Sequence, residues 1–213
     1  MEHTAFLLGI VTVFFLACQK DQTPDDSTFT SGESIYYGLV MDDHPKQPGL
    51  TFLPVNTYQQ TTDHTCAASS IVTLLRFYGR SGDEMTIASE LTTGTAGTTP
   101  EKMTFWLNNH GFTAKWHQLG TLDTLRNRLA QNKPTVVEWS DWGGHWVLCI
   151  GYDTRNTPDP LDDVILFADP FDRIDDHPDG VTWFNALRFY NMWHTTLSSG
   201  LVHHRVYLET EPI

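Results

Sequence analysis

The spacing of apolar residues changes near Pro134, and this change constrains the fold more than any other feature of the sequence. Before it, in residues 66–132, apolar side chains recur every three or four residues, as on one face of an α-helix. After it, they come in short runs rich in Val, Ile and aromatic residues, separated by turn residues, as in β-strands. Helices followed by antiparallel strands predict an α+β domain.

The expected helices have recognisable beginnings and ends. The first is stopped by Gly79 and has Asp63 and Thr65 as possible N-caps. The third takes Thr99 as its N-cap and Pro100 as its first residue, a position where proline costs no hydrogen bond. The four expected helices cover residues 66–78, 83–91, 100–110 and 122–132.

Turn residues divide the second half of the chain into strands that we expect to form an antiparallel meander. One more helix is expected after the turn at Gly180, with Trp183, Leu187 and Tyr190 on one face. The expected strands cover residues 112–117, 135–139, 145–152, 164–168 and 201–209.

The N-terminus has the composition of a targeting segment. Residues 5–17 carry no charge, are too few to span a bilayer as a helix, and match the apolar region of a signal peptide. The Leu-Ala-Cys ending at Cys18 resembles the lipobox of bacterial lipoproteins, in which the Cys is lipidated. We therefore expect a signal peptide at 1–17, a lipidated Cys18 and flexible tether at 18–34, and a single domain at 35–213. An ordinary secretory signal and an uncleaved anchor are the alternatives, and all three export the chain across one membrane. With the lipid anchor we expect the protein at a membrane surface of the cell envelope, on the periplasmic or extracellular side.

The composition excludes several classes of function. With 26 acidic and 13 basic residues, the 213-residue chain has a formal net charge of -13, which disfavours nucleic acid as a partner. Three cysteines are too few for a disulfide-rich scaffold. No Gly-rich phosphate loop and no zinc-site spacing occur, so no cofactor or metal is expected. We expect a monomer whose only membrane contact is the lipid anchor.

Cys66 opens the first expected helix. A cysteine in the first turn lies among unpaired backbone N–H groups at the positive end of the helix dipole. Both features favour the thiolate, which is the nucleophilic form of cysteine. The position of Cys66 therefore indicates a candidate nucleophile.

A second candidate group is His145, which enters a buried strand directly after two glycines. The glycines allow a substrate backbone to approach the imidazole closely. We expect Gly144, Trp142 and Trp146 to contact substrate, although at least one nearby tryptophan should pack in the core instead.

Asp169 ends the strand that follows the His145 strand. If the two strands pair as a hairpin, Asp169 returns to the His145 end and can hold the imidazole in the tautomer that a general base needs. Asp141 and Asp153 are alternative orienting acids.

Together these segments resemble the papain-like peptidases related to bacteriocin double-glycine-leader processing enzymes, over residues 54–193. The resemblance implies a papain-like α+β fold, with a nucleophile helix packed on an antiparallel sheet. It assigns catalytic roles to Cys66, His145 and Asp169, and an oxyanion-binding role to Gln60. Gln59 is the weaker alternative to Gln60. The chain departs from many relatives in having Ala67, not Gly, after the cysteine.

This resemblance implies hydrolysis of an amide bond in a peptide or protein substrate through a thioester on Cys66. Two alternatives stay open at this point. The same residues serve an acyltransferase of transpeptidase or transglutaminase type, in which an amine resolves the thioester. The other is a non-catalytic binding module with a disulfide between Cys66 and Cys149, since export favours disulfide formation.

Overall fold

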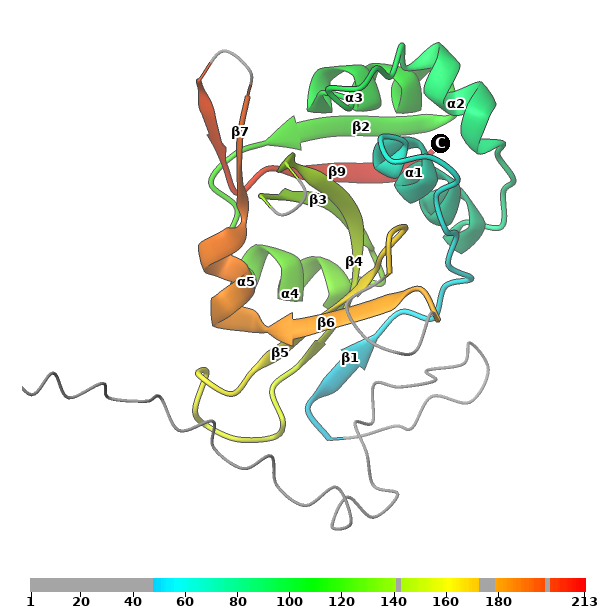
Figure 1. Cartoon of the computed structure of the whole chain (residues 1–213). Helices are drawn as coiled ribbons and strands as arrows, with labels where there is room; N and C mark the ends of the chain where they lie inside the picture. Colours follow the sequence, from blue (N-terminus) through cyan, green and yellow to red (C-terminus); the bar gives the residue numbers. More distant parts are fainter. Residues whose placement is uncertain (1–47, 141–142, 173–178, 198–199) are drawn as a thin grey trace, which may run out of the picture. The chain divides into compact units, whose positions relative to one another are not determined.

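The computed structural model describes residues 48–140, 143–172, 179–197 and 200–213 (Figure 1). Five helices lie in this part of the chain: α1 (Cys66–Phe77), α2 (Glu84–Glu90), α3 (Pro100–Asn109), α4 (Leu122–Ala130) and α5 (Ala186–Met192). The strands are β1 (Leu50–Phe52), β2 (Phe112–His117), β3 (Thr135–Trp139), β4 (His145–Asp153), β5 (Val164–Ala168), β6 (Val181–Asn185), β7 (His194–Thr196), β8 (Val202–His204) and β9 (Tyr207–Pro212).

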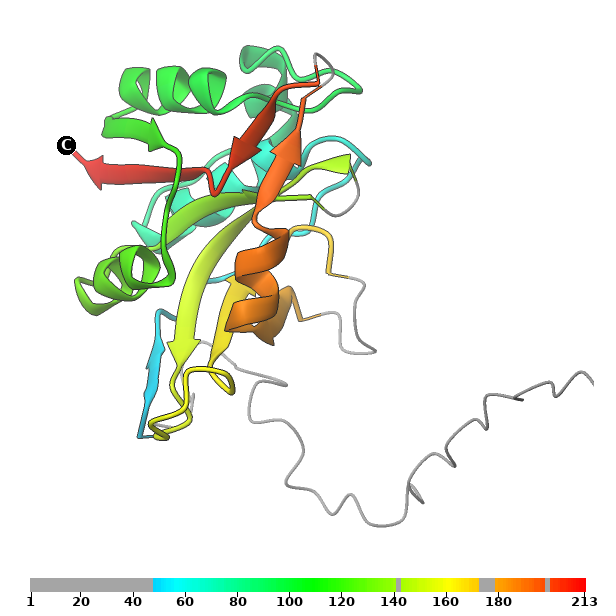
Figure 2. The ribbon, with the colours of Figure 1, turned by 90° about the vertical axis from the view of Figure 1, so that its left-hand side faces the viewer.

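One antiparallel sheet organises these elements, with strand order β2-β9-β3-β4-β5-β6. β1 pairs with the far end of β4, opposite residues 151–153. β7 and β8 form a separate two-stranded hairpin directly after α5, as the orange and red ribbons of Figure 2 show. Every residue of β4 is buried, since strands flank it on both sides and helices cover both of its faces.

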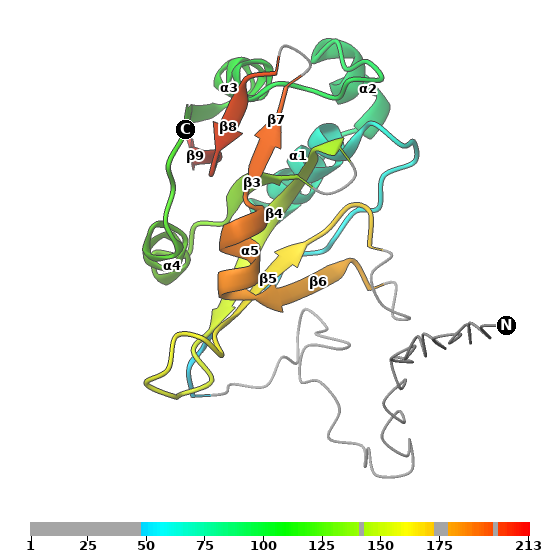
Figure 3. The same cartoon turned by 60° about the vertical axis from the view of Figure 1, so that its left-hand side comes forward.

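The alternation of β4 divides the core into two layers. Trp146, Leu148 and Ile150 pack in one apolar cluster with α1, α2 and α3. Val147 and Cys149 face the opposite way, into a second cluster with α4 and α5. Figure 3 shows α1 on one side of β4 and α4 and α5 on the other. The predicted α+β class is confirmed.

The first four helices begin within one residue of the expected positions, because apolar spacing and residues such as Pro100 are local signals. The helix expected around Trp183 is wrong at its start. Trp183 lies in β6, which pairs with β5 over its full length, and α5 begins only at Ala186, where the Asn185 side chain caps it.

The expected meander is also wrong at its end. The last predicted strand is divided into β8 and β9 by Arg205, whose φ is 50°. β9 then enters the sheet between β2 and β3. Within the described ranges, no helix has the length and apolar character needed to cross a membrane.

Candidate active site

Cys66 is the first residue of α1. Thr65 occupies the N-cap position, but its hydroxyl bonds the Glu84 carboxylate and makes no side-chain cap to α1. It therefore leaves the first-turn N–H groups of α1 uncapped. One turn further, the Ser70 hydroxyl donates to the Trp146 backbone oxygen at 2.9 Å. This bond holds the start of α1 against the start of β4.

His145 begins β4 and pairs across the sheet with Trp139 of β3. Its Nε2 lies 2.7 Å from an Asp169 carboxylate oxygen, and the Cys66 side chain also hydrogen-bonds the ring. Because Asp169 takes Nε2, Nδ1 is the ring nitrogen that faces the sulfur. The structure thus brings Cys66, His145 and Asp169 into one chain of contacts, although 79 positions separate the first two.

Asp169 follows β5 directly and is almost fully buried. One carboxylate oxygen accepts from His145 Nε2 and from the Phe171 N–H at 2.8 Å. The other accepts from the Thr182 hydroxyl at 3.0 Å. Thr182 lies in β6, so the hairpin of β5 and β6 holds the carboxylate rigidly against the imidazole. Sequence reasoning missed Thr182, which carries no local signal for this role.

The electrostatics of the site favour a charged imidazole. Burial opposes the charge on His145, but hydrogen bonds to Asp169 and Cys66 and their negative charges outweigh it and raise the pKa of His145 to about 9. The arrangement stabilises an imidazolium beside the sulfur at neutral pH.

Gln60 lines the same pocket as Cys66 and His145. Its side-chain nitrogen donates to the Thr62 backbone oxygen at 2.7 Å. An amide nitrogen carries two protons, so this bond fixes the amide and leaves one N–H available. Gln60 therefore shares a pocket with Cys66 and His145 and keeps one amide proton that this bond does not use.

Gln59 is occupied elsewhere. Its side-chain nitrogen donates to the Asp169 backbone oxygen at 2.7 Å, and its side-chain oxygen accepts from the Asp172 N–H at 3.3 Å. Gln59 thus ties the segment before α1 to the loop after β5, and its contacts distinguish it from Gln60.

Cys66 lies between two hollows of the surface and lines both. The larger, of about 550 Å³, passes between the 92–102 segment and the β7 hairpin, with Glu138 and Trp146 also lining it. The smaller, of about 250 Å³, is lined by Gln60, Asp63, Cys66, Gly144, His145 and Phe171.

The three residues predicted to contact substrate differ in where they lie. Gly144 lines both hollows, and its φ of 113° is a conformation that side chains rarely adopt. Trp146 lines the larger hollow but is mostly a core residue, 2% exposed, with its indole N–H donating to the Thr98 backbone oxygen. Trp142, like Asp141 and the lipidation candidate Cys18, lies outside the described residues.

The structure rejects two alternatives from the sequence. Asp153 is at the far end of β4, eight residues from His145 and roughly 26 Å along an extended strand, so it cannot orient the imidazole. The disulfide between Cys66 and Cys149 is wrong: both cysteines are free, and Cys149 points to the opposite face of the sheet from α1.

Glu138 of β3 is a site residue that sequence reasoning missed. It lies on the α1 face of the sheet, is 7% exposed and lines the larger hollow beside Gly144. Burial raises its pKa to about 8, against a hydrogen bond from Thr195. Among the residues that the structure covers, no group of three or more His, Cys, Asp or Glu side chains has metal-binding geometry.

Comparison with known families shows which family the chain belongs to. The model of the Peptidase_C39 like family matches residues 52–198, which is more than half of the chain. The chain belongs to this family. The membership supports a cysteine peptidase type of function and confirms the resemblance inferred from the segments around Cys66, His145 and Asp169. No curated protein matches the chain.

Several solved peptidase structures share the fold. The peptidase domain of Streptococcus ComA, a bi-functional ABC transporter, has a TM-score of 0.54 at 15% identity, covering 73% of this chain and 97% of that one. A double glycine motif protease from an AMS/PCAT transporter, solved with a leader peptide, has a TM-score of 0.54 at 14% identity, covering 76% of this chain and 94% of that one. A protein described as a C39-like peptidase from Bacillus anthracis has a TM-score of 0.51 at 15% identity, covering 78% of this chain and 100% of that one.

Proposed function

We propose that the protein is a cysteine peptidase that hydrolyses a peptide bond through a thioester on Cys66. The observation that carries this proposal is the contact chain from Asp169 through His145 to Cys66, set between two surface hollows. The double glycine motif protease solved with a leader peptide supports a peptide as the class of substrate.

Acylation begins with attack of the Cys66 sulfur on the carbonyl carbon of the substrate. A C–S bond forms, and the carbonyl electron pair moves onto oxygen. We assign stabilisation of that oxyanion to the uncapped Cys66 N–H and to the remaining amide N–H of Gln60. When the intermediate collapses, the C–N bond breaks and the His145 imidazolium gives its proton to the leaving amine.

Deacylation uses the same groups in reverse. His145, now neutral, takes a proton from water as the water oxygen attacks the thioester carbonyl. The C–S bond breaks, the carboxylic acid leaves, and the imidazolium beside the sulfur is restored. Asp169 keeps the ring oriented through both steps, because its three hydrogen bonds hold it in place.

Peptide cleavage in water labelled with oxygen-18 tests the proposal. A peptide library is incubated with the protein, and mass spectrometry follows the products. We expect one labelled oxygen in each new carboxylate and no cleavage by Cys66→Ala. The matched control Cys149→Ala removes the other free cysteine of the described residues, which faces away from α1, and should retain activity. Cleavage by Cys66→Ala at the wild-type rate would contradict the assignment.

Adding an amine to the same reaction distinguishes hydrolysis from acyl transfer. A hydrolase releases the labelled carboxylate as its main product, whereas a transferase releases the amide of the added amine. Predominant amide formation would replace hydrolysis by transfer without changing the residues involved.

We propose further that the protein is exported and anchored through a lipid on Cys18, on the strength of the apolar run 5–17 and the Leu-Ala-Cys that ends it. Growth with an alkyne-tagged fatty acid should label the wild-type protein. The Cys18→Ser variant should be unlabelled, and label retained by that variant would contradict the anchor.

A further inference from the structure

The carboxyl group of Glu138 lies in the larger hollow, and the described residues supply no charge partner for it. The side chain is 7% exposed, and one of its oxygens, Oε2, has no hydrogen-bond partner in that part of the chain. The Thr195 hydroxyl on β7 lowers the pKa of this carboxyl, although it also donates to the Trp139 backbone oxygen at 3.4 Å. A buried carboxyl with an unsatisfied oxygen is costly, so its presence calls for an explanation.

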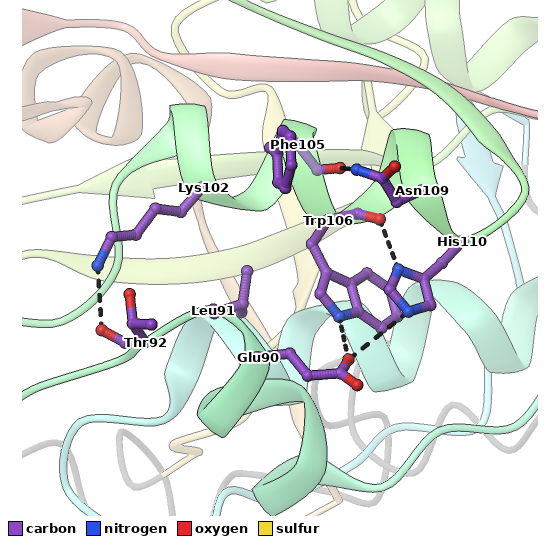
Figure 4. Close-up of a pocket in the computed structure, with 8 residues that line it drawn as sticks. All are labelled: Glu90, Leu91, Thr92, Lys102, Phe105, Trp106, Asn109 and His110. Atoms are coloured by element: carbon purple, nitrogen blue, oxygen red, sulfur yellow. Dashed lines mark hydrogen bonds and ion pairs between the residues drawn. The ribbon is translucent and has the colours of Figure 1, made fainter.

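The charges around Glu138 do not supply a partner. Glu101 of α3 is a second acid and raises the cost of ionising Glu138. Lys102 lines the same hollow, but its ammonium donates to the Thr92 backbone oxygen at 3.0 Å, at the edge of the neighbouring pocket shown in Figure 4. A purely structural role would be filled better by an apolar side chain such as that of Val136, two residues earlier on the same strand face.

The position of the hollow shows which part of a substrate would enter it. His145 must reach the leaving amine, and His145, Gln60 and Phe171 line only the smaller hollow. The larger hollow contains Cys66 but none of these three residues. It therefore lies on the acyl side of the scissile bond, where the residues that form the thioester bind.

We propose that Glu138 is a specificity-determining residue that binds a Lys or Arg side chain from one of the last two substrate residues before the scissile bond. The inference rests on the proposed peptidase function. The hollow, about 550 Å³, has room for such a side chain, and Thr98 and Thr195 line it with hydroxyl groups. An incoming ammonium or guanidinium donates to the unpaired oxygen and supplies the missing countercharge.

Paired affinity labels test the inference. Dipeptidyl fluoromethyl ketones carry Arg, or its neutral isostere citrulline, at the last or the second-last position before the reactive carbon. The Cys66 sulfur displaces fluoride from that carbon, and mass spectrometry gives the rate at Cys66. Wild type is compared with Glu138→Gln, which removes the charge, and with Glu101→Gln, a control acid that does not line the hollow.

At one of the two positions we expect wild type to react roughly 10- to 100-fold faster with the Arg label, as a charged hydrogen bond allows. In Glu138→Gln the two labels should react at nearly equal rates, whereas Glu101→Gln, which keeps the Glu138 carboxyl, should still react faster with the Arg label. Thermal melts establish that both variants are folded.

Three other results would overturn the inference. The first is an equal rate for the Arg and citrulline labels in wild type at both positions. The second is an Arg preference that survives in Glu138→Gln. Either result excludes Glu138 as the determinant, and alkylation of Cys66 by iodoacetamide then shows that the proposed nucleophile is still reactive. Failure of iodoacetamide and of every label to modify Cys66 removes the proposed peptidase function and this inference with it.

Discussion

Replacing Glu138 by glutamine should stabilise the protein in alkaline solution and have little effect in acid. The ordinary pKa of this carboxyl is 4.5, and burial raises it to about 8 in the folded chain. Between these two values the folded protein holds a proton that the unfolded chain releases, so the free energy of unfolding of wild type falls as pH rises. Glutamine does not titrate, so the free energy of unfolding of the Glu138→Gln variant does not fall for this reason.

The size of the effect follows from the same two values. A pH interval of 3.5 between 4.5 and about 8 corresponds to about 5 kcal/mol at 1.36 kcal/mol per unit. Other groups that titrate in this range, including His145, are common to both proteins and cancel in the difference. The difference in unfolding free energy should be near zero at pH 4.5 and should reach several kcal/mol above pH 8.

Urea denaturation at pH 5.0, 7.0 and 8.5 measures this difference directly. Glu101→Gln provides the control, since Glu101 is exposed and the variant keeps Glu138. Its free energy of unfolding should therefore still fall as the pH rises, as that of wild type does. A difference between wild type and Glu138→Gln that is the same at all three pH values would refute the claim that burial holds the proton on Glu138.

Two further predictions concern turnover, and a third concerns the rate of affinity labelling. Gln60→Ala should lower kcat by about 10²–10³-fold through loss of an oxyanion donor. Gln59→Ala should mainly lower the melting temperature, with a smaller effect on kcat than Gln60→Ala has, because it releases the loop after β5. Thr182→Val should lower kcat about tenfold with KM unchanged, and Thr182→Ser should restore it, since the hydroxyl orients Asp169; equal loss in both variants would contradict this role. The Arg-to-citrulline rate ratio should rise with pH up to about 8 as Glu138 ionises; the ratio cancels the titration of the catalytic groups, and a ratio independent of pH would contradict the ion pair.

The parts of the structure that sequence reasoning anticipated are those with local or short-range signals. The start of α1 at Cys66 follows from the helical spacing of the residues after it. The meeting of Asp169 with His145 follows from one hairpin, because β5 returns antiparallel along β4. Neither inference needs knowledge of the rest of the sheet.

The parts that it missed depend on distant partners. Nothing near Tyr207 indicates that β9 lies between β2 and β3, since both pairings join segments far apart in the chain. Gln59 and Gln60 are adjacent and chemically identical, so the preference for Gln60 comes from the family resemblance alone; the contacts of Gln59 with the loop after β5 distinguish the two residues in the structure. Glu138 lies between Val137 and Trp139, where alternation is normally read as an outward, solvated acid, but α1 and the β7 hairpin enclose that face.

The central claim is that His145 activates the Cys66 sulfur at a place that reagents can reach. Site-resolved alkylation by iodoacetamide in the folded protein tests it, with Cys149 as a control in the same molecule because burial raises the pKa of its thiol to about 12. At pH 7 we expect Cys66 to react at least about 100-fold faster than Cys149, and His145→Ala to slow Cys66 by at least about tenfold. Equal rates at the two cysteines, or a Cys66 rate unaffected by His145→Ala, would contradict the account.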